Sequence, residues 1–137
     1  MLLPAKRPDL HPAMTLDRIF FVAGAVSAFL GIAAGAFGAH MLKSRVTPDM
    51  LAVFEVGVRY QLYHAFALIA CAWAITRWPG DWMTAAGWLF MAGTIVFSGS
   101  LYALSLSEVR WWGAITPLGG LAFLAGWACL AVAALKP

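Results

Sequence analysis

The sequence predicts an all-α fold, a transmembrane bundle of four antiparallel helices with both termini on the same side of the membrane. Hydrophobic residues make up 63% of the chain and charged residues only 11%, whereas soluble domains are about half apolar and about a quarter charged. One small globular core could not bury this apolar excess, but a lipid bilayer can accept it. The 7 tryptophans agree, because indole rings favour the interface between membrane and water.

The chain begins with an arm that we expect to lie outside the membrane domain. Residues 1–13 combine several prolines with mixed charges and show no apolar period. Residues 14–137 are then expected to form a single four-helix membrane domain. Its first helix is predicted over 19–39, an uncharged run that spans about 30 Å, the thickness of the hydrocarbon core. A cleavable signal peptide is the alternative, since residues 34–36 (Ala-Gly-Ala) resemble a cleavage site, but the run is longer than a typical apolar signal region.

The second helix is predicted over 48–76. Thr47 is a suitable N-cap, and Pro48 fits the first helical position because its missing N–H is not needed there. The first half of this helix is polar, whereas residues 65–75 are purely apolar. The second helix is therefore expected to be divided along its length.

Two more apolar helices complete the predicted bundle. The third covers 83–106 and carries no charge. The fourth is predicted over 117–135, because Thr116 and Pro117 repeat the pattern of an N-cap followed by a proline. The short connections before and after the third helix carry tryptophans, which is typical of membrane interfaces.

Small residues mark the faces on which the helices are expected to meet. Helices in lipid associate through close packing and polar contacts, because lipid tails already solvate apolar surface. The first helix carries Gly31 and Gly35 on one small-residue stripe, and the last carries Gly119 and Gly126 on another. These stripes predict packing within one bundle, and a homodimer face remains the alternative.

The polar half of the second helix carries most of the candidate functional residues. Glu55 and Arg59 have the spacing of an acid-before-base helical pair. Tyr60 and His64 share that spacing on another side of the helix, with Gln61 near them. An ionisable residue inside a membrane helix is costly and is a candidate for function. The candidate polar or structural site, which includes one residue from the end of the first run, is His40, Glu55, Arg59, Tyr60, Gln61 and His64.

Two interpretations of this site remain open. In the structural one, Glu55 and Arg59 form an ion pair at the depth of the headgroups, and His64 forms a hydrogen bond with a neighbouring helix or with His40. In the functional one, the same residues form a proton relay or bind a polar ligand.

Other classes of site receive no support from the sequence. Cys71 and Cys129 lie inside apolar runs without the spacing of a metal site or a redox pair, so we expect no metal, no cofactor and no disulfide. No nucleophile elbow, phosphate-binding glycine loop or zinc-protease motif is present, and we expect the protein not to be an enzyme. The basic residues are scattered, which argues against a nucleic-acid partner.

Several strings of the sequence together resemble a known family. They are GAFGAH at 35–40, Phe54-Glu55 with Tyr60-Gln61 and His64, FSGSLY at 97–102, and TPLGG at 116–120 followed by Gly126-Trp127. The chain resembles the YgdD-like small integral membrane proteins, a family of unknown function with mitochondrial transmembrane relatives, over about 16–135. The resemblance implies a four-helix inner-membrane protein, and it implies no reaction and no catalytic residue.

These observations favour an accessory or structural subunit that packs against a larger membrane complex, such as an energy-transducing one. The alternative is a small oligomeric transporter or channel that uses the Glu/Arg/His set of the second helix. The expected partners are the lipid bilayer and either a membrane protein or a second copy of the chain.

The expected location is the bacterial inner membrane, crossed several times. Basic residues are commoner on the cytoplasmic side of membrane proteins. Four crossings place five basic residues on the side of the termini, namely Lys6, Arg7, Arg18, Arg77 and Lys136. The other side has Lys43, Arg45 and Arg110, and also Arg59 if that residue lies near the interface. The termini are therefore predicted to be cytoplasmic.

Overall fold

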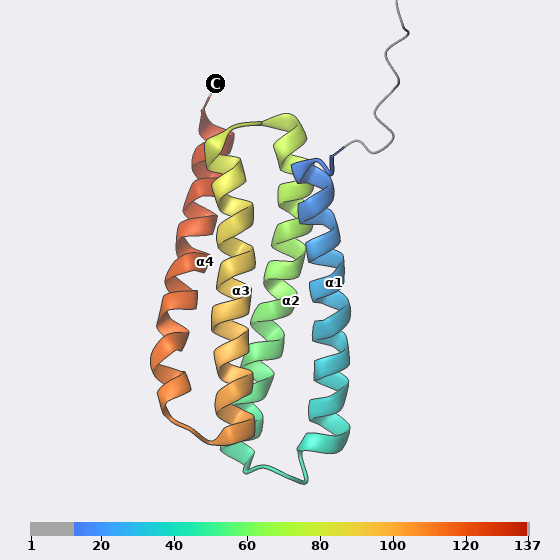
Figure 1. The fold of residues 1–137 in the computed structure, drawn as a ribbon, viewed down its shortest axis with the longest axis vertical. Helices are drawn as coiled ribbons and strands as arrows, with labels where there is room; N and C mark the ends of the chain where they lie inside the picture. Colours follow the sequence, from blue (N-terminus) through green and yellow to red (C-terminus); the bar gives the residue numbers. More distant parts are fainter. Residues whose placement is uncertain (1–12, 137) are drawn as a thin grey trace, which may run out of the picture.

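The computed structural model describes residues 13–136, and these form four long helices joined by short turns (Figure 1). The elements are α1 (Leu16–Phe37), the short π-helix η1 (Gly38–Leu42), α2 (Pro48–Arg77), α3 (Asp81–Ser107) and α4 (Trp111–Leu135). The predicted all-α four-helix fold is confirmed. Residues 1–12, nearly all of the predicted arm, lie outside the described part of the chain.

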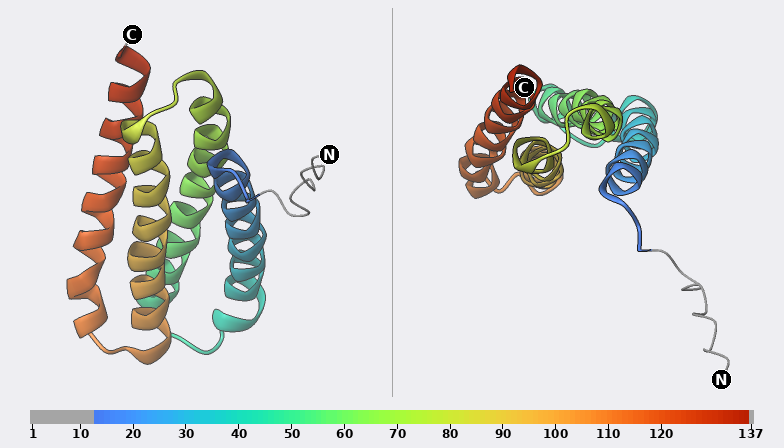
Figure 2. Two further views of the ribbon diagram at one scale, coloured as in Figure 1. Left: turned by 45° about the horizontal axis from the view of Figure 1, so that its top comes forward. Right: turned by 90° about the horizontal axis from the view of Figure 1, so that it is seen from above.

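Consecutive helices run antiparallel and pack in chain order. α1 packs on α2, α2 on α3 and α3 on α4, whereas α1 and α3 barely touch. Seen from above, α1 and α4 lie at opposite edges of the bundle (Figure 2). The start of α1 and the end of α4 lie at the same end of the molecule (Figure 1). The bundle is therefore open on its sides.

Three of the helices are long and apolar enough to cross a membrane. They are α1 with η1 (27 residues), α3 (27 residues) and α4 (25 residues). α2 is less apolar than these three helices, because its first half carries polar and charged residues. However, α2 has 30 residues and packs between α1 and α3. It must therefore cross the same membrane in the direction opposite to theirs.

The predicted cap of α2 is confirmed, but the predicted start of α4 is not. The Thr47 hydroxyl accepts a hydrogen bond from the Met50 amide at 3.3 Å, and Pro48 is the first helical residue. α4 instead begins at Trp111, so Pro117 lies inside the helix. Thr116 is not its cap, because Thr116 lies inside the helix. The Thr116 hydroxyl instead lies 2.8 Å from the Ser100 hydroxyl of α3 and 3.4 Å from the Trp112 carbonyl.

The glycines singled out in the sequence lie where helices approach closely. A Cβ atom at Gly119 would lie 2.7 Å from the Phe97 Cα, and one at Gly126 would lie 2.7 Å from the Phe90 ring. Gly31 and Gly35 of α1 face Leu62 and Val58 of α2. These small residues are used between neighbouring helices of one chain.

Candidate intramembrane binding site

The polar residues of α2 point in different directions and do not form one cluster. Glu55 and Arg59 line a shallow exposed pocket beside α1. Gln61 faces the space between α1 and α3, and Tyr60 and His64 face α4. The structure therefore divides the predicted site among three faces of α2.

His64 connects α2 to α4. Its ring is 4% exposed, its Nδ1 lies 2.8 Å from the Tyr60 carbonyl, and its Nε2 accepts a hydrogen bond from the Trp127 indole N–H at 3.3 Å. We assign the neutral tautomer with the proton on Nδ1, because this proton then binds the carbonyl and Nε2 remains free to accept. The ring also stacks on Phe123, with 3.4 Å between ring centroids and 4° between planes. A hydrogen bond from His64 to a neighbouring helix or to His40 was expected. The structure contains the bond to a neighbouring helix, through Trp127 of α4.

His40 lies elsewhere. It is an exposed residue of η1, at the end of the bundle that α1 reaches last, whereas His64 is buried near the middle of α2. The structure does not bring the two histidines together.

Gln61 connects three helices. Its side chain is 8% exposed, its Nε2 donates to the Ser27 carbonyl of α1 at 2.9 Å, and its Oε1 accepts from the Tyr102 hydroxyl of α3 at 2.7 Å. Ser98 of α3 adds a second link to α2, because its hydroxyl donates to the Gly57 carbonyl at 2.7 Å. Polar groups inside a membrane protein stabilise helix association in this way.

Glu55 and Arg59 do not form the predicted ion pair. Both side chains are exposed, and no salt bridge of 4.0 Å or less joins them. Their spacing permits the contact, but no neighbouring helix restricts either long side chain, and an exposed pair gains little over two solvated charges.

Several polar residues of α1, α2 and α3 lie at a similar depth in the membrane, near the middle of the bundle. Tyr63 and His64 stand at the midpoint of α2, Ser27 near the midpoint of α1 with η1, and Thr94 at the midpoint of α3. At 1.5 Å per residue, the middle of a 30-residue helix is about 20 Å from either end. These groups therefore lie deep in the hydrocarbon region, where polar side chains are rare and mark candidate sites.

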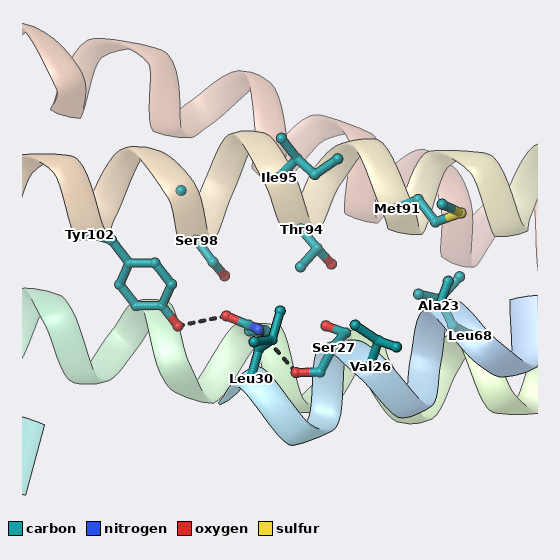
Figure 3. Close-up of a pocket in the computed structure, with 12 residues that line it drawn as sticks. Ala23, Val26, Ser27, Leu30, Leu68, Met91, Thr94, Ile95, Ser98 and Tyr102 are labelled. Atoms are coloured by element: carbon teal, nitrogen blue, oxygen red, sulfur yellow. Dashed lines mark hydrogen bonds between the residues drawn. The ribbon is translucent and has the colours of Figure 1, made fainter. Parts of the chain in front are cut away.

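Two lateral grooves open at this depth, on different faces of the bundle. The α1–α3 groove, with α2 as its floor, has a volume of about 460 Å³, and its polar and small lining residues are Ser27, Gln61, Thr94, Ser98, Gly99 and Tyr102. The α2–α4 groove has a volume of about 760 Å³, and its aromatic lining residues are Tyr60, Tyr63, His64, Phe97, Phe123 and Trp127. The α1–α3 groove is shown in Figure 3.

Comparison with known proteins places the chain in a family. Residues 34–120, more than half of the chain, match the family described as "Protein of unknown function (DUF423)". The chain belongs to this family. The matched part of this DUF423 protein contains the end of α1, η1, α2, α3 and the beginning of α4. It therefore includes Gln61 and His64 but neither Ser27 nor Trp127.

Curated relatives of the DUF423 chain are membrane proteins. It is 44% identical over 120 residues to the UPF0382 membrane protein YwdK of Bacillus subtilis, covering 87% of this chain and 98% of the relative. It is 39% identical over 120 residues to the UPF0382 inner membrane protein YgdD of Escherichia coli K12, covering 88% and 92%. The resemblance to YgdD-like proteins is thereby confirmed, and no solved structure matches the chain.

Some residues of the two grooves were not identified from the sequence as site residues. Ser98, Tyr102 and Trp127 were part of the family strings, but nothing there indicated that they form hydrogen bonds with α2. Ser27 gave no signal, because a lone serine in an apolar helix is common. Its position opposite α3 follows only from the packing of three helices.

Proposed function

We propose that this DUF423 protein is an accessory subunit of a larger inner-membrane complex, and that it binds a transmembrane helix of that complex along the α2–α4 groove. The observation that carries the proposal is the pair of tyrosines in this groove. Tyr60 and Tyr63 are 39% and 55% exposed, and among residues 13–136 neither hydroxyl has a hydrogen-bond partner within 3.5 Å.

The depth of these hydroxyls makes a partner favourable. Tyrosine is usually found at the membrane interface, where water reaches its hydroxyl. Tyr63 instead lies at the midpoint of α2, and a polar group without a partner in hydrocarbon costs several kcal/mol, on the order of 2–7. A neighbouring helix can supply a carbonyl or side-chain acceptor, whereas acyl chains cannot.

The composition of the groove also suits a protein partner. Tyrosine and tryptophan are enriched at protein interfaces and dominate their binding energy. Trp127 is 47% exposed and held by its hydrogen bond to His64, and Tyr60 packs on Phe97 with 4.7 Å between ring centroids. The aromatic surface is thus fixed before a partner arrives, which reduces the entropy lost on binding.

The arrangement gives less support to a transporter. A proton or ion pathway through Glu55, Arg59 and His64 requires these groups to line one route. Glu55 and Arg59 face the outside of the bundle beside α1, whereas His64 is buried against α4 with both nitrogens in contact with protein atoms. No observation on these residues favours transport over lateral binding.

Site-specific crosslinking in cells tests the proposal. A photoreactive amino acid at Tyr63 is expected to give one discrete crosslinked protein, and the same amino acid at Phe29, a 72% exposed residue of α1, is expected not to. Gly120→Leu should abolish the crosslink, because a Cβ there meets only the Phe97 ring, at 3.8 Å, and the longer side chain fills the groove without unfolding the bundle.

Purification completes this test. In mild detergent the wild-type chain should be isolated with a partner in fixed stoichiometry, and Gly120→Leu without it. A monodisperse wild-type chain without partner, or a crosslink only between two copies of this chain, would overturn the accessory role.

A further inference from the structure

The α1–α3 groove has polar lining residues on all three of its helices, and it is separate from the aromatic α2–α4 groove. The side chains of Ser27, Thr94 and Ser98 point toward one another across the space between α1 and α3 (Figure 3). Gln61 of α2 also lines the groove, where it donates to the Ser27 carbonyl and accepts from the Tyr102 hydroxyl. A mostly apolar groove with a few convergent polar groups is the usual composition of a small-molecule site.

The hydrogen bonds within the groove leave donors without acceptors. Thr94 donates to the Phe90 carbonyl at 2.8 Å, Ser98 to the Gly57 carbonyl, and Tyr102 to Gln61. Ser27 differs, because its Oγ is enclosed yet has no partner within residues 13–136. The Gln61 amide uses one of its two hydrogens on the Ser27 carbonyl. Within residues 13–136, one hydroxyl hydrogen and one amide hydrogen therefore have no acceptor.

These free donors define the polar part of a ligand. An amide nitrogen only donates, and a serine hydroxyl can donate as well, so the one group that satisfies both is an acceptor. No charged residue lines the groove, and an ion would be costly at this depth. The fitting group is a neutral carbonyl oxygen, which can accept from Ser27 and Gln61 together.

The depth of the site excludes the ester carbonyls of ordinary phospholipids. Ser27 lies near the middle of the span Leu16–Leu42, whereas esters lie at the edge of the hydrocarbon core, about 15 Å from its centre. The ligand must therefore carry its carbonyl into the apolar region.

The entrance of the groove leaves room for such a molecule. Gly99 lines the groove, and a Cβ atom added there would meet nothing within 4 Å. Val26, Leu30 and Ile95 provide apolar walls. An extended hydrocarbon chain can lie between these walls and continue into the bilayer.

We propose that the α1–α3 groove binds a membrane-dissolved molecule with a long apolar chain and a neutral carbonyl, a ketone or a quinone, whose oxygen accepts hydrogen bonds from Ser27 and Gln61. The proposal is independent of the accessory role, because that role uses the α2–α4 groove.

Direct binding in lipid nanodiscs tests this site. The probe is a tritiated, symmetrical long-chain dialkyl ketone, with retention by nanodiscs that hold the full chain compared with empty ones. Saturable retention is expected for the wild type. A decyl-substituted benzoquinone with its other ring positions methylated, so that it cannot add to cysteine, should displace the ketone. Decylbenzene, which has no carbonyl, should not.

Three variants assign the binding to this groove. Ser27→Ala should raise the Kd about tenfold, which equals about 1.4 kcal/mol, and its fold is secure because Ser27 Oγ forms no hydrogen bond. Gly99→Leu should abolish saturable retention by filling the entrance. Gly120→Leu, which fills the α2–α4 groove, is the matched control and should bind as the wild type does.

The opposite results would overturn the proposal. They are retention equal to that of empty nanodiscs, equal displacement by decylbenzene and the quinone, an unchanged Kd in Ser27→Ala, or full binding by Gly99→Leu. Displacement by the quinone but not by excess unlabelled ketone would also overturn it, because the site would then recognise a ring rather than a carbonyl.

Discussion

Replacement of Gln61 by alanine tests whether one side chain holds three helices together. The change removes a hydrogen bond to Ser27 of α1 and another to Tyr102 of α3. Interhelical hydrogen bonds in membrane proteins contribute about 0.6 kcal/mol on average and about 1.7 kcal/mol at most. Two of them therefore contribute between about 1 and 3 kcal/mol, and we expect Gln61→Ala to lower the free energy of unfolding by about 2 kcal/mol.

The native cysteines provide the assay. Cys71 is 0% exposed, so a thiol reagent modifies it only after the bundle opens, and Cys129→Ser in every variant leaves Cys71 as the sole reporter. When opening and closing are fast compared with labelling, the labelling rate follows the population of the open state. A loss of 2 kcal/mol then makes labelling about thirtyfold faster.

A double-mutant cycle then separates the two bonds. Tyr102→Phe removes only the bond to α3, so it should cost less than Gln61→Ala, and the two changes together should cost less than their sum. The role of Gln61 as a link between helices would be refuted if Cys71 in Gln61→Ala were labelled at the wild-type rate. It would also be refuted if the stability losses of Gln61→Ala and Tyr102→Phe simply added.

Three further predictions follow from packing, capping and charge. Gly119→Ala should lower the free energy of unfolding by about 1–3 kcal/mol, because its Cβ meets the Phe97 backbone, whereas Gly120→Ala should raise it by about 0.5–1 kcal/mol; equal effects in the Cys71 assay would contradict the close approach of α3 and α4. Thr47→Ala should cost about 1 kcal/mol through loss of the N-cap, and Thr47→Ser should restore most of it; an unchanged Thr47→Ala variant would show that the cap contributes nothing. Both termini are expected in the cytoplasm, so green fluorescent protein fused after the last residue should fluoresce, and an active alkaline phosphatase at that position would reverse the orientation.

The sequence predicted those elements whose signals are local. Uncharged runs predicted α1 and α3, because an apolar segment of that length has few stable conformations outside a membrane helix. Thr47 and Pro48 predicted the start of α2, since capping depends on adjacent residues only. Thr116 and Pro117 show the same local pattern, but there the helix continues on both sides. A bond from Thr116 to Ser100 of α3 cannot be inferred from one segment.

The candidate site depended more strongly on tertiary structure. Gln61 and His64 were singled out from the sequence as polar residues in a membrane helix, but the sequence does not tell which neighbouring helix each one faces. That depends on how α2 is rotated between α1, α3 and α4. Ser27 could be identified only from the structure, because its hydroxyl is enclosed in the folded bundle and has no hydrogen-bond partner within residues 13–136.

The short connections between the helices have a consequence for how binding must be measured. Three residues separate α2 from α3, three separate α3 from α4, and five separate η1 from α2, so the inter-helix segments offer little surface to water. A partner helix or an apolar ligand must then arrive by diffusion within the plane of the bilayer. Occupancy will follow the mole fraction in lipid rather than the concentration in solution, and diluting vesicles with buffer should leave a complex intact while diluting the protein with lipid dissociates it.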